Sequence, residues 1–367
     1  MDVRREFPEL KEIAYLNNAA ISLLPVRSRE ALISSLKERE YSGEKRMGIR
    51  DKRERITREK IAKLINASYE EICLVSNTSE GLNIFAQGLN LKEKDNVVIV
   101  RHGFPGNAVP WLNLEKKKVS VNIVESEYGE DASDKIFRAI DKNTKALAIS
   151  FVEWIDGFKY DLDKIGDFCR EHGIAFVVDS IQGVGAMNLD VRSSQISFLS
   201  NGGPKWLLSP NGTGFIFIRK DLLNKIDTKY LGYLGIRKGP MDFDYDLTLN
   251  EDASRYKVGT LNDSGIAAME KSLDLILEMD IEKIQDHILG LISYAIEHLE
   301  SKGYRKLGDF NEKNWSGVLA FGGKDIKNTY ERLIRENVIV SFRKKWIRVS
   351  PHFYNNKEDI DRMLELL

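Results

Sequence analysis

The stretch "ALAISFVEWIDGFKYDLDKIGDFCREHGIAFVVD", from Ala146 to Asp179, alternates two kinds of pattern and decides the fold class. Two short apolar, β-branched runs, at 146–152 and 174–179, enclose an amphipathic segment at 161–173. Such runs are typical of strands buried on both faces, and the segment between them is typical of a crossover helix. We therefore expect a strand, a helix and a parallel strand, which is the repeating unit of a doubly wound sheet.

The same pattern recurs along most of the chain. Further apolar runs of strand length lie at 71–76, 96–100, 119–124 and 214–218, and an amphipathic segment of helix length lies at 53–66. They predict an α/β protein whose large domain contains a mostly parallel, doubly wound sheet.

The pattern changes after residue 262. Two long helix-like segments precede several short strands and a final helix, which predicts a smaller α+β domain. We place the large domain at 16–262 and the small C-terminal domain at 263–367, and we expect the N-terminal segment 1–15 to complete the small domain.

The composition indicates which binding partners and which cellular location to expect. The chain has 55 basic and 56 acidic residues, so nothing in its charge favours nucleic acid or an anionic membrane. It has no apolar stretch of signal-peptide or membrane-span length, and we expect it in the cytoplasm. Cys73 and Cys169 indicate neither a disulfide framework nor a cysteine-based metal site, and no metal is expected.

Polar residues that follow the strands are the candidate site residues, because ligands bind at the carboxyl ends of the strands in such sheets. "SNTSEGLN" places Thr78 and Ser79 where a strand stops and a helix begins, which suits a phosphate-sized anion. The alternative is that one of them only caps the helix. "VVDSIQG" places Asp179 at the end of a strand and Gln182 three residues later, and there too a helix cap is the alternative.

Two further stretches carry candidate cations. "NGGPKWLLSPNGTG", residues 201–214, holds Lys205 in a segment where glycine and proline disfavour helix and strand. It is either placed against a ligand or merely solvated. "RKKWIRVSPHFYN" contains Arg343 and Arg348 in or beside a strand, where exposed edge positions are the alternative.

These features together fit pyridoxal phosphate acting on an amino acid. A lysine amine can bond to the cofactor aldehyde, and a buried carboxylate keeps the pyridine nitrogen protonated. At an effective dielectric constant of about 20, such an ion pair at about 4 Å is worth roughly 4 kcal/mol, or about three pKa units. An arginine would bind the substrate carboxylate.

Several blocks also carry a family resemblance. "YLNNAA", "SNTSEGLN", "VVDSIQGVGA", "GGPKWLLSPNGTGFIFI", "RYKVGTLN" and "IRVSPHFYNNKEDIDRM" resemble, in this order, the signature blocks of class V aminotransferases. These are fold type I pyridoxal phosphate enzymes, and they include cysteine desulfurases and isopenicillin N epimerase-like proteins. The resemblance extends from Tyr15 to Leu367.

The resemblance implies a role for each candidate. Lys205 would form the Schiff base with the cofactor, Asp179 would pair with the pyridine nitrogen, and Gln182 would donate to the phenolic oxygen. Thr78 and Ser79 would hold the phosphate. Phe104 would stack on the cofactor ring, with His102 or plain core packing of Phe104 as alternatives.

The remaining roles concern the substrate and a second subunit. Arg348 would bind the substrate α-carboxylate, and Arg343 would line the substrate side-chain pocket near Asn17–Ile21. Thr260 would reach the phosphate in the neighbouring subunit, which implies a homodimer with shared sites.

Departures from the family pattern limit the reaction. Desulfurases carry a nucleophilic cysteine between the positions of Arg343 and Arg348, where this chain has only "KKWI". This excludes persulfide chemistry by that route. Pro204 replaces a histidine common before the lysine, and Trp154 replaces an asparagine that touches the phenolic oxygen.

An aminotransferase is the resulting expectation. An epimerase or a β-lyase would use the same residues and stays as the alternative. A dehydrogenase is disfavoured because no G-x-G-x-x-G follows a strand. A cofactor-free binding module is disfavoured because Lys205, Asp179 and Gln182 are all present.

Overall fold

The computed structural model describes residues 3–41, 45–238 and 244–367. Its centre is a seven-stranded sheet in the order β2-β8-β7-β6-β5-β3-β4. β8 runs antiparallel to both of its neighbours, while all other pairs are parallel. The strands are β2 (Ile72–Val75), β3 (Asn96–Val100), β4 (Ser120–Val124), β5 (Thr144–Ser150), β6 (Ala175–Asp179), β7 (Phe198–Gly202) and β8 (Gly214–Ile218).

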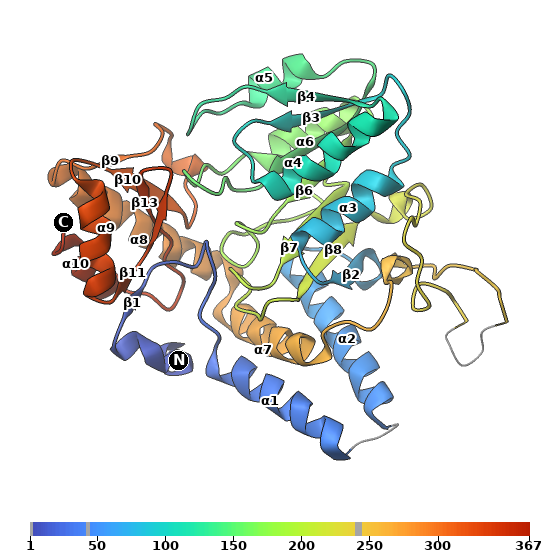
Figure 1. Cartoon of the computed structure of the whole chain (residues 1–367), viewed down its shortest axis with the longest axis horizontal. Coiled ribbons are helices and arrows are strands. Elements are labelled where there is room, and N and C mark those ends of the chain that lie inside the picture. The colour runs from blue at the N-terminus through green and yellow to red at the C-terminus, as the bar shows by residue number, and fades with distance from the viewer. Residues whose placement is uncertain (1–2, 42–44, 239–243) are drawn as a thin grey trace.

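Helices lie on both sides of this sheet, and α1 packs against α7 and not on the sheet itself (Figure 1). The helices of this part are α1 (Val26–Tyr41), α2 (Lys45–Leu64), α3 (Thr78–Gly88), α4 (Pro105–Leu112), α5 (Ser133–Ala139), α6 (Leu162–Glu171) and α7 (Asp263–Met279). The residues of the inner strands are almost all buried, which agrees with their continuous apolar runs, whereas only Val124 is buried in the edge strand β4. The expected mostly parallel, doubly wound sheet is thus confirmed.

The C-terminal part forms a second, antiparallel sheet in the order β12-β13-β10-β9. Its strands are β9 (Arg305–Lys306), β10 (Leu319–Gly322), β12 (Ser341–Arg343) and β13 (Trp346–Val349). The helices of this part are α8 (Ile281–Ser301), α9 (Ile326–Arg335) and α10 (Lys357–Leu364). The N-terminal β1 (Ala14–Tyr15) pairs in parallel with β11 (Val338–Ile339), so both chain ends lie in this part of the molecule (Figure 1). The domain boundary at 262/263 stays a prediction.

Two sequence expectations need correction. The sequence patterns missed β7, a five-residue strand that is buried throughout. Asn201 and Gly202 were expected outside regular structure, but they end β7, and Gly214 begins β8. Gly202 and Gly214 face each other across these strands, where neither needs room for a side chain.

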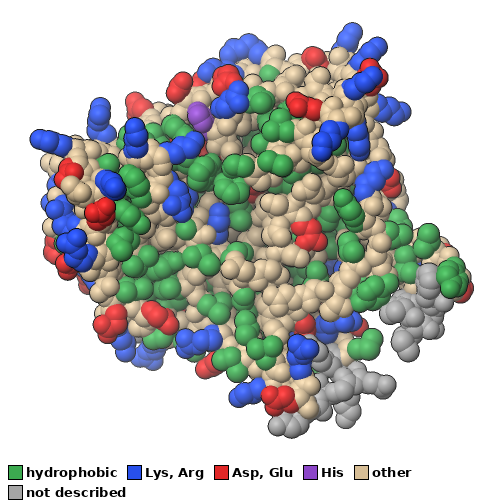
Figure 2. Space-filling model, in the orientation of Figure 1, with side chains coloured by type: hydrophobic (Ala, Val, Ile, Leu, Met, Phe, Trp, Pro, Cys, Tyr) green, Lys and Arg blue, Asp and Glu red, His purple; other side chains and the backbone are tan. Residues whose placement is uncertain are grey.

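The surface mixes both signs of charge. On the face in Figure 2, Lys and Arg side chains alternate with Asp and Glu side chains, and apolar patches lie between them. No helix among the described residues is long and apolar enough to cross a membrane.

Two helical glycines provide a test of this packing. An ideal Cβ on Gly166 in α6 would lie 1.9 Å from the Ser194 carbonyl oxygen, whereas one on Gly290 in α8 would meet nothing within 4 Å. Gly166→Ala should therefore destabilise the protein by about 1–3 kcal/mol. Gly290→Ala, the matched control, should stabilise it by up to about 1 kcal/mol. Urea unfolding of both variants measures the difference, and equal effects would contradict the close approach of α6 to the 190–196 loop.

Candidate functional site

The site begins with one carboxylate at the carboxyl edge of the large sheet. Asp179 ends β6 and lies between Ser150 of β5 and Ser200 of β7. It is 3% exposed, and its Oδ1 accepts a hydrogen bond from the Ile181 amide at 3.1 Å. Burial raises the pKa of Asp179 to about 6, so the group is mostly ionised at neutral pH.

The loop after β7 fixes the position of Lys205. The Gly203 amide donates to the Thr213 carbonyl at 2.8 Å, and the Ser22 amide donates to the Pro204 carbonyl at 2.9 Å. Lys205 itself is half-buried, which does not fit a merely solvated lysine. These two hydrogen bonds attach the two residues before Lys205 to the end of the same loop and to the N-terminal segment.

Lys205 is also poised to act as a nucleophile. Burial lowers its pKa to about 8, and the positive charge of Arg348 adds to this, while Asp179 opposes it. A lysine with such a pKa has about a tenth of its amine neutral at pH 7, far more than an ordinary lysine has. A neutral amine is the form that attacks an aldehyde.

Gln182 is held by two hydrogen bonds. Its Nε2 donates to the Ala19 carbonyl at 3.0 Å, and its Oε1 accepts from the Trp206 indole at 2.9 Å. Because an indole N–H can only donate, this contact fixes which end of the amide is oxygen. Nε2 retains its second hydrogen, which suits the expected donation to a cofactor oxygen.

The start of α3 has the features of an anion site. Asn77 is the N-cap residue, and its side chain accepts from the Glu80 amide at 2.9 Å, so neither Thr78 nor Ser79 caps the helix. The Thr78 hydroxyl is buried and has no hydrogen-bond partner among the residues that the structure describes. It lies 3.0 Å from an ideal Cβ on Gly202, three residues before Lys205. An unpartnered hydroxyl at a helix N-terminus fits a phosphate group.

Two aromatic candidates differ in where their rings lie. The Lys205 Nζ lies 5.7 Å from the centroid of the Phe104 ring, which is 40% exposed and contacts the Trp154 ring edge-on. The His102 ring instead stacks on Tyr128, with 4.3 Å between centroids. Of the two aromatic candidates, Phe104 is therefore the one whose ring lies near the Lys205 amine. Its exposure does not fit plain core packing.

Arg348 brings a positive charge from the second sheet. Its side chain is 2% exposed, and Nη1 donates to the Trp154 carbonyl at 2.5 Å, while Nε is buried without a partner. Burial lowers the pKa of Arg348 to about 10, and the charge of Arg343 adds to this. An exposed edge position is therefore the wrong interpretation for Arg348. Arg343 is half-buried and donates to the Phe342 carbonyl at 3.0 Å.

The connection between β12 and β13 is a two-residue turn. Lys344 and Lys345 have φ angles of 44° and 73°, the left-handed pair that a tight type I′ hairpin requires. Both cysteines lie elsewhere, in β2 and α6, and burial raises the pKa of each thiol to about 12. Neither is therefore suited to act as a thiolate nucleophile.

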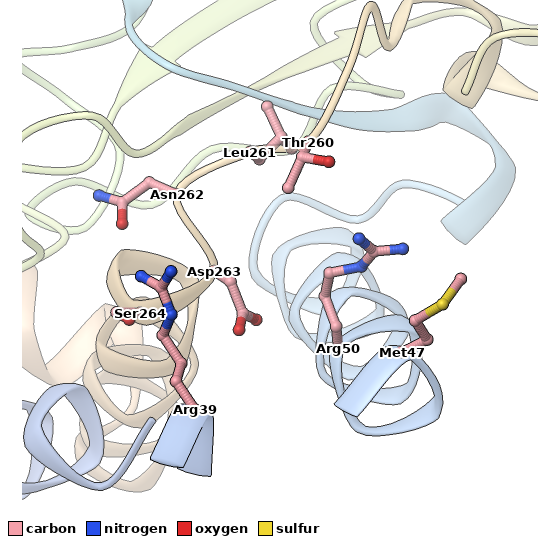
Figure 3. A pocket seen from close by; sticks show the side chains of 8 residues that line it. All are labelled: Arg39, Met47, Arg50, Thr260, Leu261, Asn262, Asp263 and Ser264. Carbon is pink, nitrogen blue, oxygen red and sulfur yellow. The ribbon is translucent and has the colours of Figure 1, made fainter. Parts of the chain in front are cut away.

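Thr260 does not join the other candidates. It is exposed and lines a separate pocket of about 430 Å³, together with Arg39 and Arg50 (Figure 3). Its hydroxyl lies 2.8 Å from the Tyr233 hydroxyl. The lining of this pocket includes neither Lys205 nor Asp179.

Three residues near the site were not singled out from the sequence. Trp206 orients Gln182, and Asn77 caps α3. Glu153 is a buried carboxyl group whose oxygens have no hydrogen-bond partner among the described residues, and burial holds its pKa well above the usual range. Trp206 had one signal, its position beside Lys205, and Glu153 also had one, because it directly follows the predicted strand at 146–152.

The buried carboxylate predicts a pH dependence of stability in the protein without cofactor. The pKa of Asp179 is raised in the folded state from 3.8 to about 6, so between these values the folded protein binds more protons than the unfolded one. As the pH rises through this range, the contribution of Asp179 to the free energy of unfolding therefore decreases by on the order of 3 kcal/mol.

Asp179→Asn removes this titration and can keep the acceptor for the Ile181 amide. Its stability relative to wild type should increase between about pH 4 and pH 6 and level off above. Urea unfolding of both proteins across this range measures the difference. A difference independent of pH would contradict the raised pKa.

Known proteins resemble this chain over nearly its full length. A probable cysteine desulfurase from Methanothermobacter thermautotrophicus is 28% identical over all of this chain and 96% of its own. An uncharacterized aminotransferase of Bacillus subtilis, YcbU, is 26% identical over 99% of this chain and 95% of its own.

Solved structures share the fold. Two structures of C-DES match this chain with a TM-score of 0.92 at 19% identity. Each match covers 98% of the C-DES chain. One is a mutant with glycine covalently linked to its PLP cofactor, and the other is described as a cystine C–S lyase in complex with cysteine persulfide. The matches cover at least 98% of this chain and show that it has the same fold.

The family model matches almost the whole chain. The model for aminotransferase class-V covers residues 14–363, from β1 to the last helix. This range includes every site residue described above. The chain therefore belongs to the aminotransferase class-V family.

Proposed function

We propose that this protein is an aminotransferase that uses pyridoxal phosphate to act on an α-amino acid. Its membership of the class V family makes it an enzyme with this cofactor. The observation that supports chemistry on an amino acid is that Asp179 and Arg348 lie close enough to Lys205 for the charges of both to shift its pKa. The two-residue turn at Lys344–Lys345 disfavours the desulfurase reaction, and the family name favours transamination. We also expect it to act in the cytoplasm.

The bound cofactor supplies an aldehyde for the substrate amine and a ring that accepts the electron pair released at the substrate Cα. Asp179 would pair with the ring nitrogen and favour its protonated form. The Lys205 amine would take up the proton released at the substrate Cα and deliver it again. Arg348 binds the α-carboxylate and orients Cα beside the lysine.

The phosphate and ring contacts come from residues of the large sheet. Thr78 and Ser79 with the N-terminus of α3 would hold the phosphate, and the unpartnered Thr78 hydroxyl supports this. Phe104 would cover one face of the ring. Gln182 would donate its free amide hydrogen to the phenolic oxygen.

Elimination at Cβ is the second candidate reaction. It needs the same residues, and the fold-similar C-DES is described as a cystine C–S lyase. Relatives named cysteine desulfurases exist, but the two-residue turn at Lys344–Lys345 and the buried thiols of Cys73 and Cys169 oppose a protein-bound persulfide. Epimerisation is a third outcome with no change of cofactor form.

We further propose a homodimer in which Thr260 contacts the phosphate held by the other subunit. Thr260 is exposed, and its pocket contains the guanidinium groups of Arg39 and Arg50, which suit an anion (Figure 3). Ile33 and Leu36 lie three residues apart on α1 and are 44% and 47% exposed. Contact with a second copy would bury such side chains.

The reaction is tested by mixing the holoenzyme with single amino acids and following the cofactor's absorbance. Transamination converts the cofactor to its pyridoxamine form. Release of a 2-oxo acid with ammonia from a retained aldehyde form indicates elimination, and appearance of the D-enantiomer indicates epimerisation.

Borohydride reduction should attach the cofactor to the peptide containing Lys205, and Lys205→Ala should lose this label. Attachment to another lysine would contradict the assignment.

The assembly is tested by light scattering of the holoenzyme together with a cofactor titration. We expect twice the mass of the chain. Thr260→Ala should remain dimeric and bind the cofactor about tenfold to hundredfold more weakly, because one hydrogen bond to a charged phosphate is lost. Thr248→Ala, an exposed threonine outside this pocket, is the control. A monomeric holoenzyme with wild-type cofactor affinity would contradict the shared site.

A further inference from the structure

The β12–β13 hairpin places a second arginine on the same face of its sheet as Arg348. Ser341 pairs with Arg348 and Arg343 pairs with Trp346. Cross-strand partners share a face, and residues two apart on one strand share a face. Arg343 and Arg348 therefore point to the same side of the sheet, and Arg348 contacts Trp154 on that side.

The tip of the hairpin is anchored to the large sheet. The Lys344 Nζ lies 3.2 Å from the Tyr128 hydroxyl, and Tyr128 stacks on His102 just after β3. At its other end, the Ser341 hydroxyl donates to the Asn17 side chain. Arg343 lies between these two contacts, so its position relative to the site is fixed by both.

The Arg343 guanidinium has no oppositely charged partner among the described residues. Its only hydrogen bond among the described parts of the chain goes to the neighbouring Phe342 carbonyl, and no described carboxylate pairs with it. Its charge acts on both Lys205 and Arg348, because it lowers the pKa of each. Three cationic groups thus face one site with Asp179 as the opposing carboxylate.

The expected ligands neutralise only part of this charge. The substrate α-carboxylate would pair with Arg348, while the cofactor phosphate would lie at the start of α3, on the large sheet. Arg343 is left with a half-buried guanidinium and a planar pair of donors. A carboxylate is the group whose geometry such a guanidinium matches best.

We infer that the substrate is an amino acid with a carboxylate in its side chain and that Arg343 binds this carboxylate. The inference rests on the proposed function of the site, because Arg348 must bind the α-carboxylate for Arg343 to face the side chain. Arg343 then acts as a specificity-determining residue. An uncharged side chain would leave its guanidinium half-buried without a counter-charge, which disfavours binding.

Matched pairs of ligands test the inference by equilibrium binding. L-aspartate is compared with L-asparagine, and L-glutamate with L-glutamine, in absorbance titrations of the holoenzyme. At least one acid should bind about tenfold to hundredfold more tightly than its amide, the range expected for a charged hydrogen-bond partner. The preference should decrease as the salt concentration rises.

Variants assign the preference to one residue. Arg343→Gln should bring the acid and its amide to within about threefold of each other, mainly by weakening the binding of the acid. The affinity for the amide should stay the same or rise, because its side chain no longer faces an unpaired guanidinium. Arg343→Lys should keep part of the preference, since it keeps the charge but loses the planar pair of donors. Lys345→Gln, at the exposed tip of the same turn, should keep all of it.

The outcomes separate this inference from the proposed function. Equal binding of acids and amides by the wild-type protein would overturn the inference but not the amino-acid chemistry. A preference that persists in a folded Arg343→Gln would also overturn it and assign the charge recognition to another cation. Absence of any spectral response to amino acids, with no borohydride label on Lys205, would instead overturn the proposed function.

Discussion

A buried guanidinium at the contact between the two sheets is the constraint on which the site depends. Arg348 is 2% exposed, and its Nη1 donates to the Trp154 carbonyl at 2.5 Å. Removing a cation from water costs several kcal/mol unless it is hydrogen-bonded or paired. The cost appears in its lowered pKa and in the Nε without a partner. A bound carboxylate would offset this cost, so the site is built to favour an anion before any anion is bound.

The distribution of charge in the site follows the same logic. Lys205, Arg343 and Arg348 supply positive charge around one ionised carboxylate, Asp179. Burial holds the pKa of Glu153 well above its usual range, which disfavours a second negative charge beside Asp179. Fixed charges of this kind act without reorganisation when a ligand arrives. They also keep Lys205 partly neutral, which is the state that the covalent step requires.

The sequence predicted the parts of the site that follow from strand ends. Asp179 was found because polar residues at the carboxyl edge of a parallel sheet are available to ligands. Lys205 was found from the glycine and proline residues around it, since the strand before it was missed. Arg348 was found as a strand residue, but its burial depends on the contact with Trp154, which no local pattern encodes. β7 was missed because "FLSNG" is short and half polar, and the pairing with β6 and β8 makes it a strand. The cap of α3 is Asn77, one residue before the expected alternatives.

The turn between β12 and β13 connects backbone geometry to the choice of reaction. A two-residue turn with left-handed φ values keeps the strands in register up to Arg343 and Trp346. It leaves no length of chain that could carry a nucleophile to the substrate and away again. A group eliminated from the substrate would therefore be released into solvent and not transferred to this turn. The same short turn fixes Arg343 beside Arg348, so the geometry that opposes a protein-bound persulfide also favours recognition of a second anionic group.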